Sequence, residues 1–230
     1  MIEQQIAYER KQLLDHWKKL SGKRPNWVAN NFSQVRKIAS LRTTAPPVSN
    51  KLLEGWLRSF HDELGYMAKN EVKDGGLCAG ALFRTQSFVE TDARSGSRKL
   101  KTQNVHIEHT VPIKVLRDKL REYAFSSDTE ALVWLLKHSV ATAFQFVEKE
   151  ALKGVSSSTK AFDPTSDEYR KPFLRYKELF AKGGRIWNVY DATVILPDQL
   201  TFDLHLQIIF RLLVEAGAER ETLNAIERYM

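Results

Sequence analysis

The stretch that decides the fold is residues 104–113, which read Asn-Val-His-Ile-Glu-His-Thr-Val-Pro-Ile. This stretch is rich in β-branched residues, which favour strands, and Val105 and Ile107 alternate with His106 and Glu108. Residues two apart in a strand share a face. We therefore predict a short strand with one apolar face, and with His106 and Glu108 together on the other.

The next three positions suggest chemistry at the end of this strand. Glu108 and His109 are adjacent, and neighbours in a regular strand point to opposite faces, so we expect the pair where the strand ends and Pro112 fixes the exit of the chain. A histidine with an ordinary pKa of about 6.5 can take a proton from water at neutral pH. A carboxylate is a hard oxygen ligand for Mg²⁺. The pair is therefore a candidate for metal-assisted phosphodiester hydrolysis.

The segment from His106 to Pro112 resembles the first half of the His-Me finger, or HNH, nuclease motif. Members of that family place an acidic residue and a histidine together at the end of a short strand, and a proline commonly follows three residues later. The resemblance implies a ββα-metal ribbon in which Glu108 binds Mg²⁺ or Mn²⁺ and His109 is the general base. It implies catalytic His106 as well, as a further ligand or a phosphate-orienting group, although a packing role for His106 is equally compatible with the pattern. Many members carry a zinc held by paired cysteines, but Cys78 is the single cysteine here, so the resemblance is to the zinc-free branch.

The family completes its metal site with a residue on the helix after the second strand, and this sequence leaves the identity of that residue open. If residues 139–146 form a strand, Glu148 or Glu150 follows it and could be the ligand. If residues 129–146 form one helix, His138 is the candidate, and Asn188 is a more distant third choice. Solvated carboxylates and a core histidine are the structural alternatives for these positions.

Working outward from the motif, apolar periodicity predicts helices on both sides. The expected helices cover residues 2–20, 50–69 with Ser49 as N-cap, 114–123, a segment capped by Asp128 or Thr129, 147–153, 171–182 and a segment starting at Thr201. Residues 77–90 look β-like, and residues 185–196 look like a hairpin. The predicted fold class is α+β, a mostly helical domain with a small central ribbon.

We expect a single nuclease domain spanning residues 1–230. Within it, residues 1–100 form a helical part that contacts DNA, residues 101–155 form the ββα-metal catalytic region, and residues 156–230 form a helical and hairpin part. This is far more chain than a ββα finger needs, which is typical of stand-alone HNH-type restriction endonucleases.

A net charge of +7 favours a polyanionic partner, because each phosphate contact releases counterions. Arginine suits bidentate contacts to guanine or phosphate, and lysine suits phosphate as a point charge. The basic residues before the motif and in a second downstream cluster are the predicted DNA contacts, namely Arg84, Arg94, Arg98, Lys99, Lys101, Arg175 and Lys177.

The resulting expectation is a type II restriction enzyme that cuts double-stranded DNA as a homodimer, one subunit per strand. No signal-peptide or membrane-spanning segment is seen, so the sequence favours the cytoplasm. No small-molecule cofactor is expected. Two other functions stay open. Glu71 and Lys73, with Asp62 upstream, fit the Glu-x-Lys pattern of the PD-(D/E)xK nucleases, and a non-catalytic DNA- or RNA-binding regulator is the alternative without chemistry.

Overall fold

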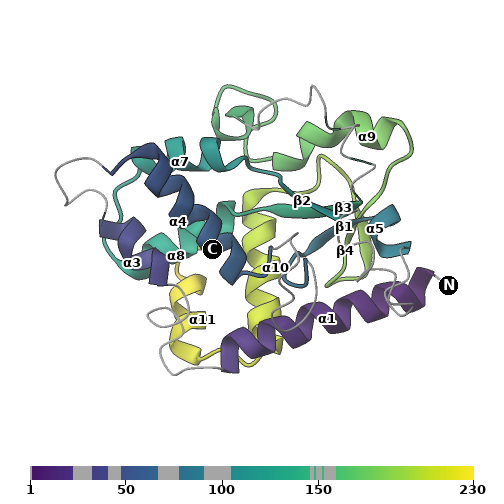
Figure 1. The fold of residues 1–230 in the computed structure, drawn as a ribbon, viewed down its shortest axis with the longest axis horizontal. Helices are drawn as coiled ribbons and strands as arrows, with labels where there is room; N and C mark the ends of the chain where they lie inside the picture. Colours follow the sequence, from purple (N-terminus) through teal and green to yellow (C-terminus); the bar gives the residue numbers. More distant parts are fainter. Residues whose placement is uncertain are drawn as a thin grey trace.

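The computed structural model describes residues 2–22, 33–40, 48–66, 78–90, 105–145, 148, 152 and 159–230 (Figure 1). The α-helices are α1 (Ile2–Gly22), α3 (Ser33–Ala39), α4 (Asn50–Glu63), α5 (Gln86–Glu90), α7 (Ile113–Glu122), α8 (Asp128–His138), α9 (Lys177–Ala181), α10 (Phe202–Glu215) and α11 (Arg220–Glu227). The short 3₁₀ helices are η4 (Thr159–Phe162) and η5 (Pro172–Tyr176). The strands are β1 (Phe83–Thr85), β2 (Val105–His109), β3 (Ala141–Gln145), β4 (Ile186–Asn188) and β5 (Thr193–Ile195).

The strands form one mixed sheet in the order β2-β3-β1-β4-β5. β1 runs parallel to β3, and the other neighbouring pairs are antiparallel. The α+β fold class, with mostly helices and a small sheet, is therefore confirmed. The sheet takes β1 from the first hundred residues and β4 and β5 from the C-terminal part, so these segments share one core.

The two strands of the predicted ribbon are β2 and β3, which pair along their whole length. The ambiguity of residues 139–146 is resolved in favour of a strand, and four of the five β3 residues are buried. α7 and α8 both lie in the connection between the two strands. The helix expected after β3 falls largely outside the described residues, which include only residues 148 and 152 of that segment.

Side-chain caps fix the starts of the helices that surround the ribbon. Ser49 accepts a hydrogen bond from the Leu52 amide at the start of α4, and Thr201 caps α10 in the same way. α8 is capped by Ser127, not by Asp128 or Thr129, because the side chain of Ser127 accepts from the Glu130 amide. These bonds satisfy amides that the first helical turn leaves unpaired.

Three segments differ from the sequence expectation. α4 stops at Glu63, short of residue 69, and Gly65 then adopts a φ of +83° that ends the helical path. In the β-like segment 77–90, only β1 is a strand, and residues 86–90 turn into α5. The helix expected over residues 171–182 is split into η5 and α9.

The helices pack against one another in two groups (Figure 1). α1 packs on α10 and α5, while α3 packs on both α4 and α8, and α4 packs on α7. The core contains large, fully buried side chains from most of these elements. None of the helices in the described part of the chain is both long and apolar enough to cross a membrane.

Candidate active site at the end of strand β2

The motif segment forms the strand that its alternation predicts. Val105 and Ile107 are buried, and His106 and Glu108 retain partial exposure. Pairing with β3 holds the strand in one register, with Glu108 opposite Thr142. The acidic–His pair therefore lies at the last two positions of β2, as expected for a site at a strand end.

Glu108 is held between two side chains. One of its oxygens lies 3.1 Å from Nε2 of His106, and the other accepts a hydrogen bond of 2.8 Å from Arg175 in η5. Burial alone would raise the pKa of Glu108, but the hydrogen bond from His106 and the charge of Arg175 outweigh it and leave that pKa lowered. Glu108 is therefore ionised at neutral pH.

Arg175 fixes the chain direction at this strand end as well. Its guanidinium donates to the backbone carbonyls of His109 (3.1 Å) and Thr110 (2.8 Å), and its side chain is only 7% exposed. Tyr176, its neighbour, donates to the hydroxyl of Thr110, which also contacts the hydroxyl of Thr142 in β3. The residues that carry the motif are thus anchored to η5 and β3 by buried polar bonds.

His109 contacts a second histidine. Its Nδ1 lies 2.9 Å from Nδ1 of His61, which is a buried residue of α4. Two ring nitrogens at this distance share one hydrogen, so one ring donates and the other accepts. If His109 donates, its Nε2 carries a lone pair and can take a proton. If His61 donates, Nε2 of His109 carries a hydrogen and can give one.

Electrostatics keep both rings neutral. Burial lowers the pKa of His109 to about 4, although the charge of Glu108 opposes the shift. Burial also lowers the pKa of His61 well below its usual range, and His109 and Arg58 contribute in the same direction. At neutral pH the His109 ring is therefore unprotonated, which a general base requires.

The sequence analysis missed His61. Its signal is visible in α4, where Leu53, Leu57 and Phe60 form the buried face and His61 lies four residues after Leu57 on that face. A histidine on an apolar stripe usually reads as a core residue. Its contact with a residue 48 positions away required the tertiary structure.

The candidates for a further metal ligand lie apart from Glu108. Glu148 accepts hydrogen bonds from the Thr85 hydroxyl (2.6 Å) and the Gln145 amide (2.9 Å), at the end of β3 opposite to that of Thr142. Asn188 is buried, and its side-chain oxygen accepts the Tyr190 and Asp191 amides in the turn between β4 and β5. Glu150 lies outside the described residues.

The remaining ligand candidate, His138, ends α8 in an aromatic environment. Its Nδ1 lies 2.8 Å from the Trp134 carbonyl, and its ring packs on Trp134 and Phe202 with centroid distances of 4.4 and 4.7 Å. Burial lowers its pKa to about 3. His138 therefore belongs to a different site from His109.

The predicted DNA contacts divide into three groups. Arg84 and Arg175 are inside the protein: Arg84 has a side chain that is 1% exposed and forms an ion pair with Glu9, and Arg175 is engaged with Glu108. Lys177 is exposed at the start of α9. The remaining four, which are Arg94, Arg98, Lys99 and Lys101, lie outside the described residues.

Of the three residues that fit the PD-(D/E)xK pattern, only Asp62 lies in the described part of the chain. Asp62 is exposed near the end of α4, and Glu71 and Lys73 lie outside the described residues. A helical Asp62 does not lie on a strand next to a second carboxylate, so the described part of the chain adds nothing to this alternative.

A divalent cation at this strand end would need several oxygen or nitrogen donors that point to one place. In the described part of the chain, no group of three or more His, Cys, Asp or Glu side chains converges to hold a metal ion. At the strand end itself Glu108 is the one carboxylate among the contacts described above, and both of its oxygens already have partners. The described residues alone therefore do not fit the expected Mg²⁺ or Mn²⁺ centre.

Comparisons of the chain with protein-family models, with curated proteins and with solved structures found no match.

Proposed function

We propose that this chain is an endonuclease of the His-Me type, a phosphodiesterase that hydrolyses double-stranded DNA with His109 as general base. The observation that carries the proposal is the pair His61–His109, in which a neutral histidine at the end of β2 is oriented through its Nδ1 and stands beside an anchored carboxylate. Such a base, aimed by a second group, is the arrangement that general-base catalysis needs.

The reaction can be written from the residues at this site. With the shared hydrogen on Nδ1 of His109, its Nε2 takes a proton from water while the water oxygen bonds to phosphorus. The bond from phosphorus to the 3′ oxygen breaks, and that oxygen takes a proton from solvent, so the product carries a 5′ phosphate. His61 accepts the Nδ1 hydrogen throughout and keeps the ring in this tautomer.

Charge around the site suits a phosphate. Arg58, on the exposed side of α4, is close enough to lower the pKa of His109, and Arg175, which is paired with Glu108, acts in the same direction. Both cations oppose protonation of the base, and the exposed Arg58 would attract the negatively charged substrate. Lys177 in α9 is exposed and lies two residues after Arg175. Among the predicted DNA contacts in the described part of the chain, it is the candidate for a phosphate contact.

The expected Mg²⁺ or Mn²⁺ dependence stays a prediction. No step above passes through the ion, because the described donors do not build its site. Recognition of a specific sequence by a homodimeric type II restriction enzyme is likewise part of the proposal, supported by the net charge of +7 and by the length of chain outside the ribbon.

The test is cleavage of phage DNA by the purified chain, with Mg²⁺, with Mn²⁺ and with a chelator. We expect His109→Ala to lose about 10²- to 10⁴-fold in rate and to retain DNA binding, because removal of a general base affects the chemical step. Discrete fragments would indicate sequence-specific cleavage, and a smear would indicate a non-specific nuclease.

Two controls separate the alternatives. Glu71→Ala should leave cleavage unchanged, and loss of cleavage in that variant with full activity in His109→Ala would favour the PD-(D/E)xK reading. No cleavage under any of the three conditions, together with DNA binding, would favour the non-catalytic regulator.

A further inference from the structure

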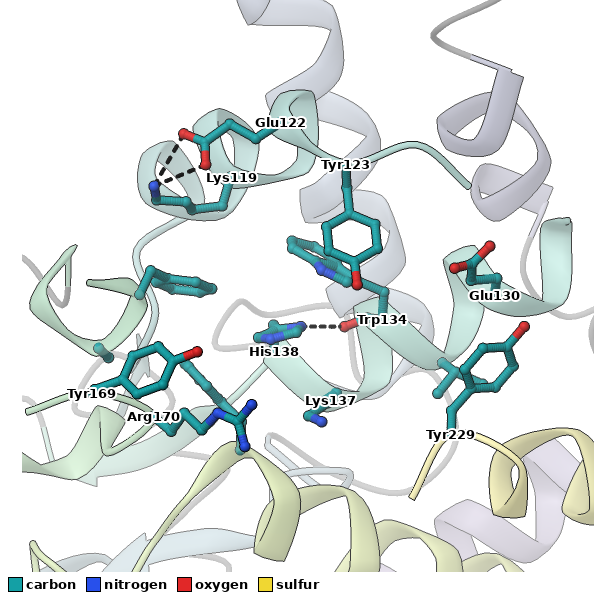
Figure 2. A pocket seen from close by; sticks show the side chains of 14 residues that line it. Lys119, Glu122, Tyr123, Glu130, Trp134, Lys137, His138, Tyr169, Arg170 and Tyr229 are labelled. Carbon is teal, nitrogen blue, oxygen red and sulfur yellow. Dashed lines mark hydrogen bonds and ion pairs between the residues drawn. The ribbon is translucent and has the colours of Figure 1, made fainter. Parts of the chain in front are cut away.

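A pocket of about 330 Å³ lies around His138, at the C-terminal ends of α7 and α8 (Figure 2). Its size is within the range of small-ligand pockets. α7 starts just after the β2 strand end and contributes Lys119 and Glu122 to the pocket at its other end, followed by Tyr123. His138, at the end of α8, is three residues before Ala141, the β3 residue that pairs with His109.

Aromatic side chains form the floor of this pocket. The His138 ring packs on Trp134 and Phe202, and the Phe162 ring lies 5.0 Å from that of Phe202 and 5.4 Å from that of His138. Figure 2 shows His138 between Tyr169 and Arg170 on one side and Trp134 on the other. Flat rings on several sides favour a flat, aromatic ligand.

The mouth of the pocket exposes further aromatic surface. Tyr123, Tyr169 and Tyr229 line the pocket and are 47%, 37% and 41% exposed. They account for three of the seven large apolar side chains that are exposed in the described part of the chain, so this surface is concentrated at one place. An aromatic concentration at a pocket mouth is typical of a binding site.

His138 presents a defined acceptor to the pocket. Its Nδ1 hydrogen is donated to the Trp134 carbonyl, which leaves the lone pair of the neutral ring on Nε2. The His138 ring lines the pocket, and Nε2 is the ring nitrogen that does not contact the Trp134 carbonyl. The pocket therefore offers an acceptor for a ligand N–H group.

The charges beside His138 favour an anionic group on the ligand. Lys137 and Arg170 share one carboxylate, that of Asp203, so this end of the pocket carries a net positive charge. Lys119 is paired with Glu122, and Glu130 accepts hydrogen bonds from Ser126 at the start of α8. A cationic ligand would meet the uncompensated charge next to His138, whereas a phosphate would be attracted by it.

The backbone holds Arg170 in place. Its φ of 62° is in the left-handed region, which is unfavourable for a residue with a side chain. Two hydrogen bonds stabilise it, from the Arg170 amide to the Ala161 carbonyl (2.8 Å) and from the Phe202 amide to the Arg170 carbonyl (3.0 Å). The guanidinium also lies over the Tyr169 ring at 5.2 Å, so cation and stacking surface are positioned together.

We propose that this pocket binds one unpaired nucleotide of a nucleic-acid strand. The base stacks on the tyrosine and tryptophan rings and donates an N–H to Nε2 of His138, and its phosphate contacts Arg170 and Lys137. The inference rests on the proposed function in that the occupant is a nucleotide of the DNA substrate that has left its base pair. Because His138 is three residues before Ala141, which pairs with His109, one strand of a few nucleotides can reach both sites.

The experiment measures binding of deoxynucleoside monophosphates by calorimetry, on the His109→Ala variant with chelator present. The result is then independent of whether the chain cleaves DNA. The four monophosphates are compared with deoxyribose 5-phosphate, which lacks the base, and with choline, which is an aromatic-cage cation. We expect at least one monophosphate to bind and both comparison ligands to bind at least tenfold more weakly.

Two variants test the stacking surface. Tyr123→Ala and Tyr169→Ala remove exposed side chains and should each weaken nucleotide binding about 5- to 150-fold, the range for loss of one stacked base. Leu196→Ala is the matched control, because Leu196 is 48% exposed and lies outside the pocket. Thermal unfolding of each variant checks the fold.

Four outcomes overturn the proposal. Equal binding of deoxyribose 5-phosphate would assign the pocket to a phosphate alone, and preferential binding of choline would make it a cation cage. Failure of all four monophosphates to bind at millimolar concentration, or unchanged affinity in both tyrosine variants, would exclude a nucleotide there. If the unmodified chain cleaves DNA while any of these results is found, the pocket proposal is wrong and the proposed nuclease function is still supported.

Discussion

Two pairs of histidines lie in the described part of the protein, and they are held in different ways. His61 and His109 contact each other through Nδ1 at the end of β2. His138 and His205 each have Nδ1 at hydrogen-bond distance from a backbone carbonyl, that of Trp134 and that of Lys137. Burial lowers the pKa of all four rings, so burial alone does not distinguish the pairs.

The difference lies in the partner. A carbonyl can only accept, so it fixes the hydrogen of His138 and His205 on Nδ1. A second imidazole can accept or donate, so the hydrogen between His61 and His109 can belong to either ring. A tautomer fixed by a carbonyl suits recognition, as at His138 in the pocket, or packing, as at His205. A ring oriented through Nδ1 by a second imidazole suits proton transfer at its Nε2, which is why we place chemistry at His109 and binding at His138.

The largest expected effect is a loss of stability at the strand end that carries His109, with no change around His138 and His205. Arg175→Ala should lower the free energy of unfolding by about 3–5 kcal/mol, because it leaves Glu108 and two carbonyls near the end of β2 without their buried partner. Urea unfolding measures this, and the side-chain ¹⁵N signals of His61 and His109 should shift while those of His138 and His205 stay unchanged.

The matched control is Lys177→Ala, since Lys177 is exposed and two residues away. It should change stability by less than about 0.5 kcal/mol. If Lys177 contacts phosphate, the variant should also reduce the slope of log DNA affinity against log salt concentration by about one unit. Equal stability of Arg175→Ala and Lys177→Ala would mean that Arg175 does not anchor the strand end.

Acid titration provides the second test, at the carbonyl-bound pair. His205 is fully buried, and burial lowers its folded-state pKa to about 4 from 6.5. Below pH 6.5 the unfolded chain takes up a proton that the folded chain refuses until about pH 4, so His205 makes stability fall as the pH drops through this window. At pH 5 this amounts to about 2 kcal/mol.

His205→Asn keeps an N–H group near the Lys137 carbonyl and removes the titration. The variant should lose some stability at pH 7, but its loss between pH 7 and pH 5 should be about 2 kcal/mol smaller than that of the unmodified chain. Urea unfolding at both pH values measures the difference. The same loss in both proteins would show that His205 binds its proton equally well in the folded and unfolded chains.

The two pairs also show how far the sequence leads. β2, the Ser49 and Thr201 caps and the hairpin near residues 185–196 follow from local patterns, because strand alternation, capping and turn chemistry act between near neighbours. Whether residues 139–146 form a helix or a strand was open, and pairing with β2 decides it.

What the sequence does not show is which polar side chains meet. Arg84 pairs with Glu9, 75 positions earlier, and Arg175 pairs with Glu108, 67 positions earlier. The local sequence predicts that both arginines belong to a DNA-binding surface, yet each is buried and forms an ion pair with an acidic residue. His61 was missed for the same reason, because its importance comes from His109.

The smallest expected effect is the loss of a helix cap in α4 or α8, the helices that carry one histidine of each pair. α4 carries His61, α8 ends at His138, and each begins with a serine whose hydroxyl accepts an amide, Ser49 from Leu52 at 3.2 Å and Ser127 from Glu130 at 3.1 Å. Ser49→Ala and Ser127→Ala should each cost about 1 kcal/mol of unfolding free energy.

Their local consequences should differ if the two regions have the assigned roles. Fraying of the first turn of α4 leaves His61 three turns away, so DNA cleavage by Ser49→Ala should stay within about twofold of the unmodified chain. Ser127→Ala also removes a partner from the turn in which Glu130 lines the pocket, so its nucleotide affinity should fall while its cleavage rate does not. A fall in cleavage that matches the fall in nucleotide affinity would mean that the two regions act as one site, since separate sites respond separately to distant changes.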